Sequence, residues 1–117
     1  MRTYSATGSK SLASGAMVTA ASLSLDPGTY IVHANARFDS NSTGYRFLCL
    51  DPTSGNLNAD WLKYCGVQVP AASGARTYIG TMVISSSSTS RTMNAKVQQG
   101  SGSTLNSEVY IEAVRLM

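Results

Sequence analysis

The alternation of apolar and polar residues in 29–38 constrains the fold of this chain more than any other feature of its sequence. One set of alternate positions holds Tyr30, Val32, Ala34, Ala36 and Phe38, and the other holds Ile31, His33, Asn35 and Arg37. Successive side chains of a β-strand point to opposite faces, whereas a helix repeats its faces about every 3.6 residues. The pattern therefore predicts a strand with one buried face and one partly polar face.

The rest of the chain follows the same organisation. Further short strands are predicted in 12–25, 45–50, 65–69, 77–85, 92–98 and 105–117, separated by Gly, Pro, Asn and Ser turn residues. Residues 1–11 are predicted as a connector or an irregular first strand, 12–117 as one domain, and 51–64 as an irregular segment within it. Seven or eight short strands at this regular spacing indicate an all-β antiparallel sandwich or barrel.

Composition agrees with a β-fold and excludes several other classes. Hydroxyl residues occupy 29 of 117 positions (18 Ser and 11 Thr), while 13% of the residues are charged. A solvated helical bundle carries more charge on its outer faces. A nucleic-acid-binding protein carries a basic cluster, whereas the net charge of +3 is spread singly along this chain. Because no run approaches the ~18 apolar residues of a membrane span, we expect neither nucleic-acid binding nor membrane insertion.

Residues that carry chemistry are few and scattered, so we predict no enzyme activity, no metal and no cofactor. His33 is the single histidine, and no nucleophile motif of the Gly-x-Ser-x-Gly type occurs. Asp51 and Asp60 are a conceivable carboxylate pair for glycoside hydrolysis, but both lie among turn-forming residues. A structural zinc site needs four Cys or His ligands, and the sequence has three such residues in total.

The second faces of three predicted strands have a mixed character. Arg37 and Lys96 lie on two of these faces and Glu112 lies on the third, so that opposite charges occur on different strands. Tyr110 and Val114 add aromatic and apolar surface to the last strand. Such faces suit an oligomer interface and equally suit a solvated sheet face, and the residues alone leave both interpretations open.

The order and spacing of several motifs resemble small jelly-roll domains of bacteriophage tail and head fibre proteins. The main motif reads Leu-Ser-Leu-Asp-Pro-Gly-Thr-Tyr-Ile-Val over 23–32 and continues as Ala-Asn-Ala-Arg-Phe over 34–38. Shorter motifs follow as Gly-Tyr-Arg over 44–46, Val-Gln-Val-Pro-Ala over 67–71, Gly-Ser-Gly-Ser-Thr-Leu-Asn over 100–106 and Ala-Val-Arg-Leu over 113–116. The resemblance covers 12–117. Such domains are similar in topology to the tumour-necrosis-factor and complement globular-head superfamily, which implies a two-sheet antiparallel jelly roll that assembles as a trimer.

The resemblance also implies a function and an interface. It implies a homotrimer on a fibre or surface appendage of the virion, which is assembled in the host cytoplasm with other virion proteins. The implied function is binding of a host-surface receptor for phage adsorption. The receptor is commonly a saccharide but also a protein. One sheet lines the trimer axis in the superfamily, and the strands implied here are 29–38, 92–98 and 105–117. The implied interface residues are Ile31, His33, Asn35, Arg37, Asn94, Lys96, Tyr110, Glu112 and Val114. The alternative function is a structural head-fibre, decoration or collar protein that binds no receptor.

The segment 51–64 has no counterpart in the family pattern and holds the single Trp of the chain. Sugar sites combine a flat aromatic face with planar amide and carboxylate groups. The candidate ligand-binding residues are Asp51, Asn56, Asn58, Asp60, Trp61 and Tyr64. The alternative is that Trp61 closes the end of the sandwich or packs against a neighbouring subunit.

Two cysteines, Cys49 and Cys65, flank the same segment. The N-terminal residues lack the apolar core of a secretion signal, so we expect free thiols in a reducing compartment. One disulfide between the two cysteines is the alternative, because two cysteines permit a bridge without forming a disulfide framework.

Overall fold

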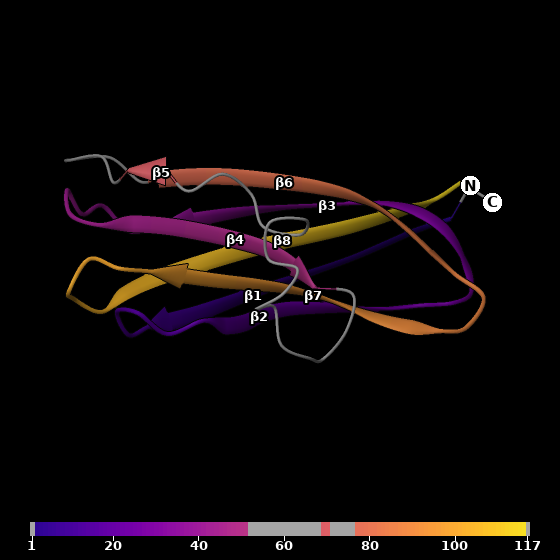
Figure 1. The fold of residues 1–117 in the computed structure, drawn as a ribbon, viewed down its shortest axis with the longest axis horizontal. Coiled ribbons are helices and arrows are strands. Elements are labelled where there is room, and N and C mark those ends of the chain that lie inside the picture. The colour runs from indigo at the N-terminus through magenta and orange to yellow at the C-terminus, as the bar shows by residue number, and fades with distance from the viewer. Residues whose placement is uncertain (1, 52–68, 71–76, 117) are drawn as a thin grey trace.

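The computed structural model describes residues 2–51, 69–70 and 77–116, which form two four-stranded antiparallel sheets (Figure 1). The strands are β1 (Thr3–Leu12), β2 (Val18–Leu25), β3 (Gly28–Phe38), β4 (Tyr45–Asp51), β5 (Val69–Pro70), β6 (Thr77–Ser87), β7 (Arg91–Gln99) and β8 (Leu105–Arg115). Strand β1 begins and β8 ends at one end of the sandwich, the terminal end. The β1–β2, β3–β4 and β7–β8 connections lie at the opposite end, the loop end (Figure 1).

The strand order identifies the topology. Sheet A has the order β1-β8-β3-β6, and sheet B has the order β2-β7-β4-β5. With the exception of β4 and β5, which both belong to sheet B, consecutive strands lie in opposite sheets. This is the antiparallel two-sheet jelly roll, so the predicted fold class is confirmed. Residues 52–64 of the predicted irregular segment and most of the predicted strand 65–69 lie outside the described residues.

The core lies between the two sheets and contains the apolar face predicted for β3. Tyr30, Val32, Ala34, Ala36 and Phe38 are each at most 2% exposed. The inward positions of neighbouring strands complete the core with Leu48, Leu50, Met93, Ala95, Val97, Val109, Ile111 and Ala113. Alternation of period two therefore places one face of each of these strands in the core and the other face outside it.

Strand β1 accounts for most of the segment 1–11, which the sequence leaves as a connector or an irregular strand. It pairs with β8 at ten consecutive positions, from Thr3 opposite Val114 to Leu12 opposite Leu105. Its outward residues are mostly Ser and Thr, and its inward ones include Gly8, so hydrophobic alternation is weak there. Gly8 lies where β1 comes close to sheet B, and a Cβ at this position would overlap the carbonyl oxygen of Ala20.

Two buried polar side chains hold the connections at the loop end. Arg46 is fully buried and donates three hydrogen bonds of 2.8–3.1 Å to backbone carbonyls within 41–45. Gln99 is also fully buried; its Nε2 donates to the carbonyl of Leu12 at 3.0 Å, and its Oε1 accepts the Ser101 N–H at 2.7 Å. Buried polar groups are tolerated where they are hydrogen-bonded, and here they link loops to strands.

Candidate functional site: the outer face of sheet A

Strand register orders the outward side chains of sheet A into rows. From the terminal end to the loop end, in the strand order β6, β3, β8, β1, the rows are Ile84–Ile31–Val114–Thr3, Met82–His33–Glu112–Ser5, Gly80–Asn35–Tyr110–Thr7 and Tyr78–Arg37–Glu108–Ser9. Directly opposed residues on one face of a sheet have Cβ atoms about 4.5–5.5 Å apart. Each row is therefore a line of neighbouring side chains, and the face changes in character from row to row.

The two rows nearest the terminal end carry an apolar patch, which consists of Ile31, Met82, Ile84 and Val114. Ile84 is 73% exposed and Met82 is 67% exposed. Five large hydrophobic residues are exposed in the described part of the chain, and three of them, including Tyr78, lie on β6. The outward positions of β2 and β7 in sheet B hold Thr19, Ser22, Ser24, Thr92, Asn94, Lys96 and Gln98. Covering apolar surface is favourable by about 25 cal/mol per Å², so the apolar patch of sheet A gains from a partner.

A hydrogen-bonded cluster lies beside the apolar patch. His33 Nε2 lies 2.9 Å from Glu112 Oε1, and the Tyr110 hydroxyl donates to Glu112 Oε2 at 2.7 Å. The Tyr110 hydrogen bond, followed by that of His33, lowers the pKa of Glu112, and the carboxylate in turn raises the pKa of Tyr110. Glu112 is therefore a fixed carboxylate with a partner for each oxygen atom.

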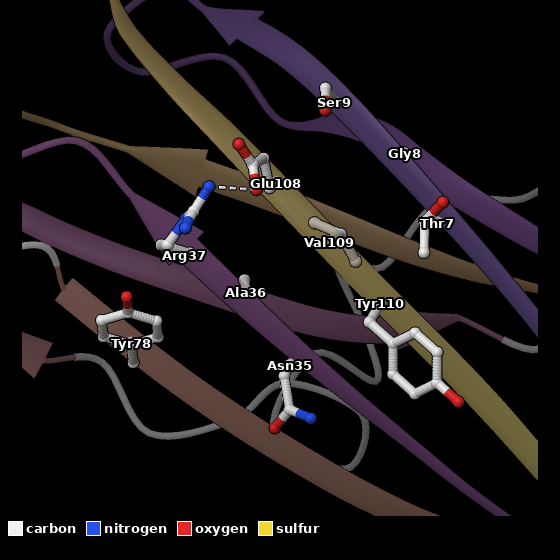
Figure 2. Close-up of a pocket in the computed structure, with 10 residues that line it drawn as sticks. All are labelled: Thr7, Gly8, Ser9, Asn35, Ala36, Arg37, Tyr78, Glu108, Val109 and Tyr110. Atoms are coloured by element: carbon white, nitrogen blue, oxygen red, sulfur yellow. Dashed lines mark ion pairs between the residues drawn. The ribbon is translucent and has the colours of Figure 1, made fainter.

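The two rows nearest the loop end enclose a shallow depression of about 410 Å³, called here the loop-end depression (Figure 2). Its outward-facing lining residues are Thr7 and Ser9 of β1, Asn35 and Arg37 of β3, Tyr78 of β6, and Glu108 and Tyr110 of β8. Gly80 lies next to Asn35 and has no side chain, and the Asn35 Oδ1 lies 3.0 Å from the position that a Cβ would occupy. The amide of Asn35 therefore leans over the β6 backbone.

Arg37 and Glu108 form an ion pair between adjacent strands of this depression (Figure 2). The hydrogen bond to Glu108 raises the pKa of Arg37, and a hydrogen bond with the Tyr78 hydroxyl acts in the same direction. The Asn35 side chain, by contrast, is exposed and makes no hydrogen bond to another of the described side chains. The depression thus combines exposed aromatic surface, an available amide and a neutralised ion pair.

The implied interface residues divide between the two sheets. Seven of the nine lie on the outer face of sheet A, namely Ile31, His33, Asn35, Arg37, Tyr110, Glu112 and Val114. Asn94 and Lys96 do not, because β7 pairs with β2 and β4 in sheet B. There, the Ser22 hydroxyl donates to Asn94 Oδ1 at 2.7 Å. The implied placement of 92–98 in the same sheet as 29–38 and 105–117 is therefore wrong, because the connections on both sides of β7 cross between the layers.

Sequence reasoning did not identify the β6 residues of this face. Strand 77–85 alternates, but both of its faces contain apolar residues: Tyr78, Met82 and Ile84 on one, Ile79 and Val83 on the other. The alternation therefore could not show which face is turned to solvent. Only the pairing of Ile84 with Ile31 assigns Ile84 to the outer face.

The predicted sugar-binding residues are placed only in part. Asp51, at the end of β4, is 2% exposed, and its Oδ2 lies 2.8 Å from Lys96 Nζ. This carboxylate therefore belongs to a largely buried ion pair of sheet B and is not presented to solvent as a ligand group. The other five candidates, Asn56, Asn58, Asp60, Trp61 and Tyr64, lie outside the described residues.

Cys49 is disulfide-bonded, which corrects the expectation of free thiols in favour of the alternative. The other cysteine of the chain, Cys65, lies outside the described residues. Within 2–51, 69–70 and 77–116, no group of three His, Cys, Asp or Glu side chains is arranged to hold a metal ion. The same part of the chain contains no helix of the length and hydropathy that crossing a membrane requires.

The comparisons with known proteins give a fold relationship. The chain matches no protein-family model, and no curated protein sequence is similar to it. The solved structure of the infectious bursal disease virus Gx strain matches with a TM-score of 0.58 at 9% identity, covering 98% of this chain and 33% of that one. The Gt strain gives a TM-score of 0.59 at 8% identity over 97% and 32% of the two chains.

A crystal structure of the VP2 subviral particle of the same virus gives a TM-score of 0.56 at 9% identity, over 97% of this chain and 33% of that chain. This chain therefore spans about a third of the chains that it matches. At such low identity the similarity establishes the fold, and the fold is one that occurs in the particles of a virus.

Proposed function

We propose that this chain is a non-enzymatic structural module of a virion that assembles as a homotrimer through the apolar patch on the outer face of sheet A. Its fold also occurs in viral particles, and the resemblance of 12–117 to phage fibre domains supports the same function. The observation that carries self-association is the apolar patch, where Ile84 and Met82 are 73% and 67% exposed. Contiguous exposed apolar surface of this kind marks interaction sites on soluble domains.

A second copy of the chain is the partner that fits this face best. The four side chains of the apolar patch carry no charge, so that like copies do not repel one another there. Four strands about 4.8 Å apart and some ten residues long at ~3.4 Å per residue give the whole face a projected area of about 600 Å². The apolar patch occupies the half of this area that lies toward the terminal end.

Sedimentation velocity and light scattering of the purified chain at micromolar concentration test the assembly. The expected result is a particle of three times the 12.3 kDa subunit mass. A stable monomer at these concentrations would overturn the homotrimer.

We further propose that the trimer stands on a phage fibre or surface appendage and binds a host-surface receptor. The support is the resemblance of the sequence motifs, together with the exposed polar side chains of the loop-end depression. Host-cell pull-down with the wild-type protein tests the proposal, and the same experiment with Trp61→Ala shows whether the segment 51–64 takes part in binding. Absence of host-cell binding by the wild type would favour the structural head-fibre, decoration or collar function instead.

A further inference from the structure

We propose that the loop-end depression binds a neutral saccharide through Tyr78, Asn35 and the Arg37–Glu108 pair. The inference rests on the proposed function, because it names the ligand class and the site for receptor binding. It places that site on sheet A and not in the segment 51–64.

The aromatic component is Tyr78, which is 66% exposed at the β6 side of the depression (Figure 2). It lies directly opposite Arg37 of the neighbouring strand, so the ring stands beside the Arg37–Glu108 ion pair. Aromatic rings offer an apolar face together with a polar edge. A pyranose presents a matching apolar face of C–H groups, with its hydroxyls around the rim, so stacking on Tyr78 leaves the hydroxyls directed at the surrounding strands.

The polar component comes from the adjacent strands. The Asn35 amide offers an acceptor oxygen and a donor nitrogen side by side, which match two neighbouring hydroxyls of a sugar, each a donor and an acceptor. Thr7 and Ser9 of β1 line the opposite side of the depression, three strands away from Tyr78. A sugar ring on Tyr78 would therefore take its polar partners from Asn35 and from the Arg37–Glu108 pair.

The charge of the depression selects among saccharides. Arg37 is paired with Glu108, whose side chain is 57% exposed, so the positive charge is already neutralised and a carboxylate is turned toward solvent. A sugar carboxylate would meet Glu108 as a like charge and would have to compete for Arg37. Hydroxyls can instead accept from the guanidinium and donate to the carboxylate while the ion pair stays intact.

The depression and the apolar patch occupy different rows of the same face. The depression lies toward the loop end, and the apolar patch toward the terminal end. Arg37, in the far row, follows Ile31 by six residues of β3, about 20 Å, whereas the nearest rows, those of His33 and Asn35, adjoin at about 7 Å. A contact between copies that is confined to the rows of the apolar patch therefore leaves the depression open to a ligand.

Ligand-observed NMR and isothermal titration calorimetry on the full chain test the site. The probes are glucose, galactose, rhamnose and N-acetylglucosamine as neutral sugars, and glucuronic acid and N-acetylneuraminic acid as acidic ones, all at millimolar concentration. We expect at least one neutral sugar to bind and the acidic sugars to bind more weakly or not at all. Tyr78→Ala is expected to weaken binding about tenfold, the loss of one aromatic contact of ~1.4 kcal/mol, whereas Tyr78→Phe keeps the ring and most of the affinity.

Two further variants separate this site from the other proposals. Asn35→Ala is expected to weaken sugar binding, while Ile84→Ser, which alters the apolar patch, is expected to weaken assembly and leave sugar binding per subunit unchanged. The inference is overturned if no neutral sugar binds, if acidic sugars bind more tightly, or if Tyr78→Ala and Asn35→Ala bind as the wild type does. It is also overturned if binding is lost in Trp61→Ala alone. Assembly is read independently by light scattering, so a monomer that still binds sugar would refute only the trimer.

Discussion

The apolar patch gives the sharpest prediction for assembly, which is the effect of Ile84→Ser. Fully burying an Ile side chain stabilises by about 1.5–3 kcal/mol. Ile84 is 73% exposed in the single chain, so covering it completely is worth about 1–2 kcal/mol per copy. A trimer covers three copies, and the loss is therefore about 3–6 kcal/mol for each trimer formed. Because every 1.4 kcal/mol is a factor of ten, the association constant falls by about two to four orders of magnitude.

The measurement is a concentration series in sedimentation velocity. Trimer formation from monomers depends on the square of the free subunit concentration at the midpoint, so we expect the midpoint to rise by about 10- to 100-fold for that change in free energy. Thermal unfolding monitored by circular dichroism, at a concentration where both proteins are monomeric, should be nearly unchanged, because a side chain so exposed contributes little to the monomer core.

Met17→Ser is the matched control. Met17 is an apolar residue with 38% exposure in the β1–β2 connection, outside the apolar patch. It should leave the midpoint within about twofold, the range of an ordinary surface substitution. If Ile84→Ser assembles like the wild type, or if Met17→Ser weakens assembly equally, the proposed interface is wrong.

Four further predictions concern stability and chemistry. Arg46→Met should lower the free energy of unfolding by about 3 kcal/mol, since three hydrogen bonds at ~1 kcal/mol each are lost, and should lower Tm by about 10–20 °C in a thermal scan; an unchanged Tm contradicts the anchoring role. Gly8→Ala should cost about 1–3 kcal/mol because its Cβ meets backbone, whereas Gly80→Ala, which meets a movable side chain, should cost less than ~1 kcal/mol in the same urea titration. The pKa of Glu112 is lowered in the folded protein, so its carboxylate contributes stability that is present above the ordinary pKa of 4.5 and is lost as the pH falls through the folded pKa. Glu112→Gln should therefore show a smaller fall in stability on acidification than the wild type. Identical pH profiles of the two proteins would refute this contribution. Alkylation without a reductant should leave Cys49 unmodified by mass spectrometry, and modification of most molecules would contradict the disulfide.

Much of the fold could be predicted from the sequence because period-two alternation is strong where one face is apolar and the other polar. β3 is the clearest case, and its five inward residues are those predicted. The signal weakens in β1, where hydroxyl residues fill the outward positions and Gly8 lies among the inward ones, and such a strand is difficult to distinguish from a connector. It is also ambiguous in β6, because both faces are apolar and alternation gives no direction.

The candidate site depended on information that a single strand does not contain. The polar faces of β3, β7 and β8 look alike in sequence, yet β7 lies in the other sheet and Asn94 with it. The residues of a single strand determine which of its faces is apolar. The connections and the long-range pairing determine which strands share a sheet. Seven of the nine interface candidates predicted from the sequence are outward residues of sheet A. The sequence could not exclude Asn94 and Lys96 from this face. It also could not identify Tyr78, Met82 and Ile84 as part of the face.

The loops that border the depression order the backbone beneath the proposed sugar site. The backbone N–H of Asp39 donates to the carbonyl of Asn106 at 3.1 Å, and the N–H of Asn106 donates back to Asp39 Oδ2 at 3.2 Å. These two bonds close the sheet just beyond Arg37 and Glu108, and the buried Arg46 fixes the following loop. The side chains of the depression therefore stand on backbone that is already ordered, so ligand binding does not carry the cost of ordering a loop. Asp39→Ala should therefore weaken sugar binding by raising the dissociation rate while Tyr78 and Asn35 remain in place. An unchanged dissociation rate in NMR line-shape analysis would show that preorganisation at this end contributes nothing to binding.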